Sequence, residues 1–151
     1  MYLSSDTVQI LKNLSTINQS ILIKPGKVLS SMSVMKNILV SADITEKFEK
    51  QVAIYDLNQF LNGMGLHQDP ELDFANEGHV MIKEGRMRTK YFFADPNVII
   101  TPPDKNLELP TEDVSFELRT EQLDKLLKAA AIYQLPDLSV VGEAGVVKLV
   151  V

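Results

Sequence analysis

The amino-acid sequence predicts an α+β fold in which helices cover one face of antiparallel sheets. Short apolar runs separated by turn dipeptides, such as Pro25-Gly26 and Glu84-Gly85, are typical of antiparallel hairpins. Two segments with helical spacing, residues 4–14 and 56–64, interrupt these runs, and the first helical pattern recurs at residues 120–130. Strands and helices do not alternate as βαβ units, so a parallel sheet is not expected.

The composition is that of a globular protein without thiol chemistry. The chain has 151 residues, of which 45% are hydrophobic and 23% charged, and it has no cysteine. No apolar run approaches the roughly 20 residues that span a bilayer, and the polar first residues do not resemble a signal peptide. We therefore expect an intracellular protein with no membrane partner, no disulfide and no thiolate metal site. The net charge of −5 argues against a dedicated DNA-binding domain, although an acidic protein can still present one basic surface.

A first helix is expected over residues 4–14, because Ser4 carries a hydroxyl suited to an N-cap. At about 100° per residue, one side of this helix should be buried and the other exposed. The expected buried side consists of Thr7, Ile10, Leu11 and Leu14. The expected exposed side carries Ser5, Gln9, Lys12 and Thr16.

The following segment predicts strands and a short second helix. The runs 21–24 and 27–32 flank Pro25-Gly26 and are interpreted as a hairpin, with further strands at residues 38–42 and 50–54. A helix is expected over residues 56–64, with Asp56 or Tyr55 at its cap. Its buried side should carry Leu57, Phe60, Leu61 and Met64, and its exposed side Gln59 and Asn62.

A three-strand meander should complete this part of the chain. The strands are expected at residues 71–75, 79–83 and 86–93, with turns at 76–78 and 84–85. Along the last strand, the basic residues Arg86, Arg88 and Lys90 alternate on one face. This alternation is either a basic stripe or a means of discouraging edge-to-edge pairing.

A change of composition marks the end of the first domain. Residues 101–113 hold three prolines and five charged residues without periodicity, which predicts an extended linker. The domains are therefore expected at residues 1–100 and 114–151, and the second domain is expected to be incomplete. The second domain should consist of a strand at 114–118, the repeated helix at 120–130, and a hairpin of strands 138–141 and 146–151. In the repeated helix, Leu123, Leu126, Leu127 and Ala130 should be buried, with Glu121, Lys125 and Lys128 opposite.

The exposed helix sides consist mainly of amides, hydroxyls and lysines. Acidic residues are largely confined to the first turns, where the helix dipole favours them, at Asp6, Asp56 and Glu121. One interpretation is an ordinary solvated face with a few lysines. The other is a surface that contacts a polyanion without recognising its sequence, since isolated lysines and amides suit sequence-independent phosphate contacts.

Several strings of residues resemble the sliding clamps of T4-like bacteriophages, the processivity factors of DNA polymerase. The most specific string is Val52-Ala53-Ile54-Tyr55-Asp56-Leu57-Asn58-x-Phe60-Leu61. Others are Ser4-x-Asp6-Thr7, Leu11-Lys12-Asn13-x-x-Thr16-Ile17-Asn18, Ala94-Asp95-Pro96 and Leu107-x-Leu109-Pro110. The resemblance runs along the whole chain and is weaker through residues 26–48 and 66–92.

This resemblance implies a DNA-clamp fold, with antiparallel sheets outside and two helices per domain lining one face. Three two-domain subunits of such clamps close into a ring around duplex DNA, with strands outside and helices lining the hole. The resemblance further implies a clamp loader that uses ATP, a polymerase tethered by its C-terminal peptide, no catalysis and no cofactor, in the cytoplasm of an infected bacterial host. The chain stops early relative to such clamps, so we expect a fragment or a shortened relative, with a dimer as an alternative to the trimeric ring.

The resemblance also suggests functional residues. Lys12 and Lys128 occupy matching positions in the two copies of the helix and are expected to face DNA, together with Lys125, Gln9, Gln59 and Asn62. Leu107 and Leu109 are expected to contribute to the pocket for partner peptides. Alternatively, these two leucines only hold the linker against the sheet.

Other signals favour neither catalysis nor metal binding. His67, Asp69, Glu71 and Asp73 lie within seven residues but lack the spacing of known metal motifs, so a polar loop is expected. No glycine-rich phosphate loop or nucleophile motif is present, which argues against an enzyme. The alternative function is a small interaction module that uses exposed sheet edges, such as residues 146–151, and does not bind DNA.

Overall fold

The computed structural model describes residues 1–103, 111, 115–143 and 145–151. The chain divides into two compact units, residues 1–105 and 106–151, and each is described by itself. None of the described helices is long and apolar enough to cross a membrane.

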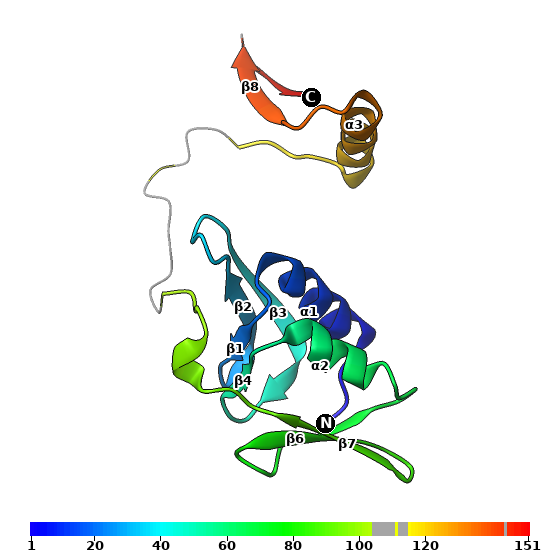
Figure 1. Ribbon diagram of the computed structural model, residues 1–151. Coiled ribbons are helices and arrows are strands. Elements are labelled where there is room, and N and C mark those ends of the chain that lie inside the picture. The colour runs from blue at the N-terminus through cyan, green and yellow to red at the C-terminus, as the bar shows by residue number, and fades with distance from the viewer. Residues whose placement is uncertain (104–110, 112–114, 144) are drawn as a thin grey trace. The chain divides into compact units, whose positions relative to one another are not determined.

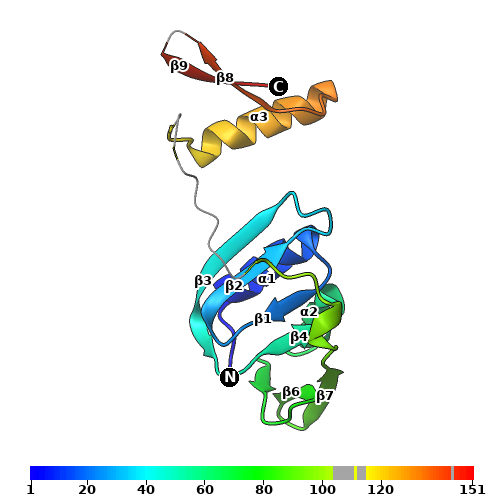
Figure 2. The same cartoon turned by 90° about the vertical axis from the view of Figure 1, so that its left-hand side faces the viewer.

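The first unit combines helices α1 (Ser5–Ile17) and α2 (Leu57–Met64) with antiparallel strands. The strands are β1 (Ile21–Ile23), β2 (Gly26–Met32), β3 (Leu39–Phe48), β4 (Val52–Ile54), β5 (Glu71–Asp73), β6 (His79–Glu84) and β7 (Met87–Phe92), followed by a 3-10 turn, η1 (Pro96–Val98). They pair as β1-β4, β2-β3 and β5-β6-β7. Both helices lie on one side of β1 to β4 (Figure 1), and Figure 2 shows these strands from another side. The α+β prediction is confirmed.

The core lies between the helices and the strands. Leu11 and Leu14 of α1 and Leu57 and Phe60 of α2 are buried against Ile21, Ile54, Val80 and Ile82 of the strands. Thr7 is also buried, as expected, whereas Ile10 is only half-buried. The predicted helix sides are therefore right except at Ile10.

The predicted hairpin of residues 21–24 and 27–32 is wrong. β1 pairs with β4, with Ile21 opposite Ile54, and β2 pairs with β3. Pro25-Gly26 forms a corner between two sheets, where Gly26 has a φ of 131° that favours glycine. The partner of β1 is β4 because all three residues of β4 are buried and match its buried isoleucines, a contact that turn residues cannot reveal.

Strand β3 is longer than predicted and ends at Phe48 rather than residue 42. Ile44 and Phe48 are buried on its inner side, and the polar residue between them, Glu46, interrupts the apolar alternation on which the prediction depended. The meander of β5, β6 and β7 is confirmed, with Gly85 at a positive φ of 53° in its second turn.

The carboxylate of Glu46 joins β3 to the start of α1. One oxygen accepts the backbone N–H of Ser4, and the other accepts the hydroxyl of Thr7 at 2.5 Å. The Ser4 hydroxyl in turn accepts the Thr7 N–H at 3.2 Å, as an N-cap does. Partial burial acts to raise the pKa of Glu46, but the hydrogen bonds from Thr7 and Ser4 outweigh it and hold this pKa below its ordinary value.

The second unit contains helix α3 (Thr120–Tyr133) and the antiparallel hairpin β8 (Ser139–Glu143) and β9 (Val146–Val150). The helix and the hairpin are as predicted, although the helix runs three residues further. Residues 115–118 do not form the predicted strand, since no strand pairs with them in the described part of the chain. The N-cap is Arg119, whose N–H donates to the Gln122 side chain at 3.3 Å.

The buried side predicted for the repeated helix is only partly formed. Leu123, Leu126 and Ala130 are half-buried, and Leu127 is 50% exposed, so the expectation for Leu127 is wrong. Helical spacing identifies the side chains that share a side, but it does not establish that other elements cover them.

We predict that Glu46→Ala lowers the free energy of unfolding by about 1–2 kcal/mol at neutral pH, because two donors lose a charged acceptor. The folded-state pKa of Glu46 is depressed, so its stabilisation is present above the unfolded-state pKa and is lost as the pH falls through the folded-state pKa. Urea unfolding of the wild type and the variant should therefore converge in acid. Glu49→Ala removes an exposed neighbouring carboxylate and serves as the control; an equal effect of both variants, or a difference independent of pH, would contradict the role of Glu46.

Candidate nucleic-acid interface

Two adjacent helices form the polar surface that the sequence singles out. α1 and α2 lie side by side (Figure 1) and contact each other. They bury their apolar sides in the same core, so their polar sides are both exposed to solvent. Lys12, Gln9, Gln59 and Asn62 are all exposed. The exposure expected for these four residues is therefore present.

A groove between the helices brings together Lys12 of α1 and Asn62 of α2. The groove has a volume of about 570 Å³ and is lined by Lys12, Ser15, Thr16, Asn58, Leu61, Asn62, Gly65 and Leu66. The hydroxyls of Ser15 and Thr16 donate to helix carbonyls at 2.7 Å, so the Lys12 ammonium and the two asparagine amides remain as its outward donors. None of the described residues that line this groove is acidic, which makes it suited to an anionic ligand.

The remaining predicted residues lie in other places. Gln9 lines a hollow of about 350 Å³ with Asp6 and part of β3, and Gln59 lines one of about 510 Å³ between α2 and β7. Lys125 and Lys128 are exposed on α3 in the second unit. Leu107 and Leu109 lie outside the described residues.

Asp56 fixes the beginning of α2. Its carboxylate accepts the N–H of Gln59 at 2.8 Å and the side-chain amide of Gln19 at 3.0 Å. The hydrogen bond from the Gln59 N–H has the larger effect, and together the two hydrogen bonds lower the pKa of Asp56. The carboxylate is thus ionised and bound at the positive end of a helix, where it acts as a cap rather than as an acid or base.

Tyr91 of β7 holds the same helix start from the other side. Its hydroxyl accepts the Asp56 N–H at 3.2 Å and donates to the Asp56 carbonyl at 3.0 Å. Its ring packs edge to face on Phe60, with the ring centroids 5.2 Å apart, and burial raises the pKa of its hydroxyl. Nothing in the sequence indicated this contact, because its partners lie 35 residues apart.

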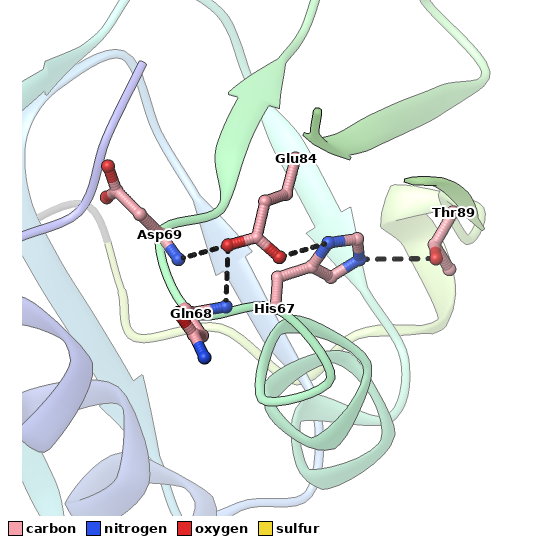
Figure 3. A network of polar contacts seen from close by, with 5 residues as sticks. All are labelled: His67, Gln68, Asp69, Glu84 and Thr89. Carbon is pink, nitrogen blue, oxygen red and sulfur yellow. Dashed lines mark hydrogen bonds and ion pairs between the residues drawn. The ribbon is translucent and has the colours of Figure 1, made fainter. Parts of the chain in front are cut away.

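A buried histidine fixes the segment that follows α2 (Figure 3). The His67 ring, which is fully buried, lies with Nε2 3.3 Å from the Thr89 hydroxyl and Nδ1 3.7 Å from a Glu84 carboxylate oxygen. The other Glu84 oxygen accepts the N–H groups of Gln68 and Asp69, both at 3.0 Å. His67 thus ties this loop to β6 and β7, and in the described part of the chain no three His, Asp or Glu side chains are placed to hold a metal.

Comparison with known proteins finds similarity along most of the chain. The family described as DNA polymerase processivity factor matches residues 4–101. Over 146 residues, the sliding clamp of Escherichia phage RB69 is 32% identical and that of Enterobacteria phage T4 is 31% identical. The sliding clamp of Vibrio phage KVP40 is 31% identical over 148 residues. Each match covers 96% of this chain but only 64% to 66% of the relative, so the chain spans slightly less than two thirds of their length.

We predict that Tyr91→Phe destabilises the fold by about 1 kcal/mol, because the backbone of Asp56 loses its hydroxyl partner in a partly buried position. Amide exchange at Asp56 should accelerate at the same time. Tyr55→Phe, which removes the hydroxyl of a neighbouring tyrosine that is 61% exposed, is the matched control and should change neither quantity. Equal urea midpoints for the Tyr91 variant and the wild type would exclude this role.

Proposed function

This chain belongs to the DNA polymerase processivity factor family, and we propose that it is a sliding-clamp subunit that holds duplex DNA without reading its sequence. The observation that carries the proposal is the groove between α1 and α2, which Lys12, Asn58 and Asn62 line and whose described lining residues include no acidic residue. Such donors can contact phosphates without recognising the bases.

Weak contacts are what sliding requires. Each lysine–phosphate contact is modest and salt-dependent, so Lys12 and Lys128 align the duplex without fixing its position, and encirclement supplies the persistence. Lys125, Gln9, Gln59 and Asn62 add further contacts from the helix sides. The clamp performs no chemistry: it needs no cofactor, and the carboxylates of Asp56, Glu46 and Glu84 are engaged by backbone N–H groups.

The proposed subunit has a clamp domain at residues 1–100, a linker at 101–113 and part of a second clamp domain at 114–151. Its partners are the C-terminal peptide of the replicative polymerase, a clamp loader and further copies of the subunit, in the cytoplasm of the infected host cell. The copies associate into a trimeric ring, with a dimer as the alternative assembly.

One observation supports association between copies and also favours the alternative function, a protein-interaction module. Among the described residues from 115 onwards, no side chain is fully buried, and β8 and β9 expose several valines. These are Val140, Val141, Val146 and Val150. Apolar side chains on an open hairpin are suited to another chain, whether or not DNA is bound.

We expect Lys12→Glu with Lys128→Glu to weaken loading onto primed circular DNA and leave the melting temperature unchanged, since both side chains are exposed. The slope of log affinity against log salt should fall by about 1.8, or 0.9 for each lost phosphate contact. The control, Lys27→Glu with Lys47→Glu, makes the same charge change at exposed positions of β2 and β3. Unchanged DNA retention by the Lys12 and Lys128 variant would refute the proposal and favour the interaction module.

For the polymerase contact, we expect Leu107→Ala with Leu109→Ala to abolish binding of the polymerase C-terminal peptide. The physical reason is the loss of the aliphatic groups that form the peptide pocket. Calorimetric titration measures the binding, and a thermal melt of the same variant is the control. A lower melting temperature with intact peptide binding would show instead that the leucines only hold the linker.

A further inference from the structure

The outward side of β7 carries cations and an aromatic ring in a row. Arg88, Lys90 and Phe92 alternate with Thr89 and Tyr91, and the first three are exposed while the latter two are half-buried. Arg86 precedes them in the turn and is also exposed. We call Arg86, Arg88, Lys90 and Phe92 the β7 stripe. Alternate residues of a strand lie about 7 Å apart on one side, so the stripe presents its groups at regular intervals.

The cations of the β7 stripe are not held in ion pairs by the described residues around them. In the β6–β7 register, Arg88 lies opposite Lys83, whose ammonium is already paired with Asp73, and Lys90 lies opposite Met81. Among the described residues, no ion pair involves Arg86, Arg88 or Lys90. These three are therefore available to an anion, in a protein of net charge −5.

Aromatic side chains accompany these cations. Phe92 is 70% exposed and lies beside the His79 ring, with ring centroids 5.7 Å apart. Lys90 and Phe92 also line the hollow of about 510 Å³ between β7 and α2, together with Tyr55, which is 61% exposed. Asp56 lines this hollow too, and its carboxylate is occupied by hydrogen bonds from Gln59 and Gln19. Two exposed aromatic residues thus share one hollow with a lysine.

Discouraging edge pairing explains exposed cations but not exposed aromatic rings. An acidic peptide would neutralise the cations without using the rings, and a duplex keeps its bases stacked inside. A single strand offers both partners at once, because its phosphates pair with arginine and lysine while its unstacked bases stack on aromatic rings. We propose that the β7 stripe and Tyr55 bind single-stranded nucleic acid. This surface does not include the groove between α1 and α2, although Gln59, assigned to the duplex above, lines the same hollow as Tyr55. Binding of a single strand goes beyond the duplex contact proposed above.

The test measures binding of fluorescein-labelled oligothymidylate to the full chain by fluorescence anisotropy. Arg88→Gln with Lys90→Gln should weaken binding and lower the salt slope by about 1.4, or 0.7 for each lost phosphate contact. Phe92→Ala should weaken binding roughly fivefold or more and leave the salt slope unchanged, because it removes base stacking only. The same titration with labelled oligouridylate shows whether the surface binds DNA or RNA.

Two controls make the result specific. Lys27→Gln with Lys47→Gln makes the same charge change on β2 and β3 and should bind like the wild type. Lys12→Gln with Lys128→Gln should also keep oligothymidylate binding, so failure of the duplex proposal remains distinguishable from failure of this one. Thermal melts should be unchanged for all variants, because every substituted side chain is exposed.

Three outcomes would overturn the proposal. One is oligothymidylate binding that is unaffected in the β7 stripe variants. Another is competition by blunt duplex DNA as effective as that by the single strand, with the same loss in Phe92→Ala. The third is binding of anionic phospholipid vesicles or polyglutamate through the stripe in the absence of oligothymidylate binding.

Discussion

The first unit depends on one constraint: α1 and α2 must bury their apolar sides in a single shared core. Leu11, Leu14, Leu57 and Phe60 are all almost inaccessible to solvent there. Once these side chains are buried, the helix geometry leaves no freedom in the orientation of the remaining positions. Lys12 and Asn62 consequently line one groove, although strands β1 to β4 lie between them in the chain.

Four acidic residues of this unit hold the scaffold together. Glu46 accepts hydrogen bonds at the start of α1, Asp56 caps α2, Glu84 holds the loop after α2, and Asp73 pairs with Lys83. Exposed acidic residues such as Asp43, Glu49 and Glu77 are not among the described residues that line the groove between the helices, so an acidic chain can still present a groove without negative side chains there. The average charge of the sequence therefore says little about the charge of this groove.

The features that the sequence predicted well are local ones. Helical periodicity identified both helices and their buried sides, and turn residues identified the β5-β6-β7 meander. The pairing of β1 with β4 and the full length of β3 depend on partners distant in sequence, such as the donors to Glu46, and no local pattern encodes them. The same limit applies to the residues predicted to face DNA. The angular positions of Gln9 and Gln59 on their helices correctly predicted that both are exposed, but only the packing of the helices decides that they line different hollows. The sequence pattern singles out His67 because acidic residues follow it closely in the chain. Its partners in the structure, Glu84 and Thr89, come instead from β6 and β7.

Helix α2 has only eight residues and would be marginal in isolation, so it depends on its two ends. Asp56, with Gln19 and Tyr91, fixes its beginning, and His67, with Glu84 and Thr89, fixes the segment after it. None of these residues lines the groove between the helices. Evolution can therefore exchange Asn58 or Asn62 for other polar residues at little cost in folding, which lets the surface adapt to a new ligand while its support is inherited unchanged.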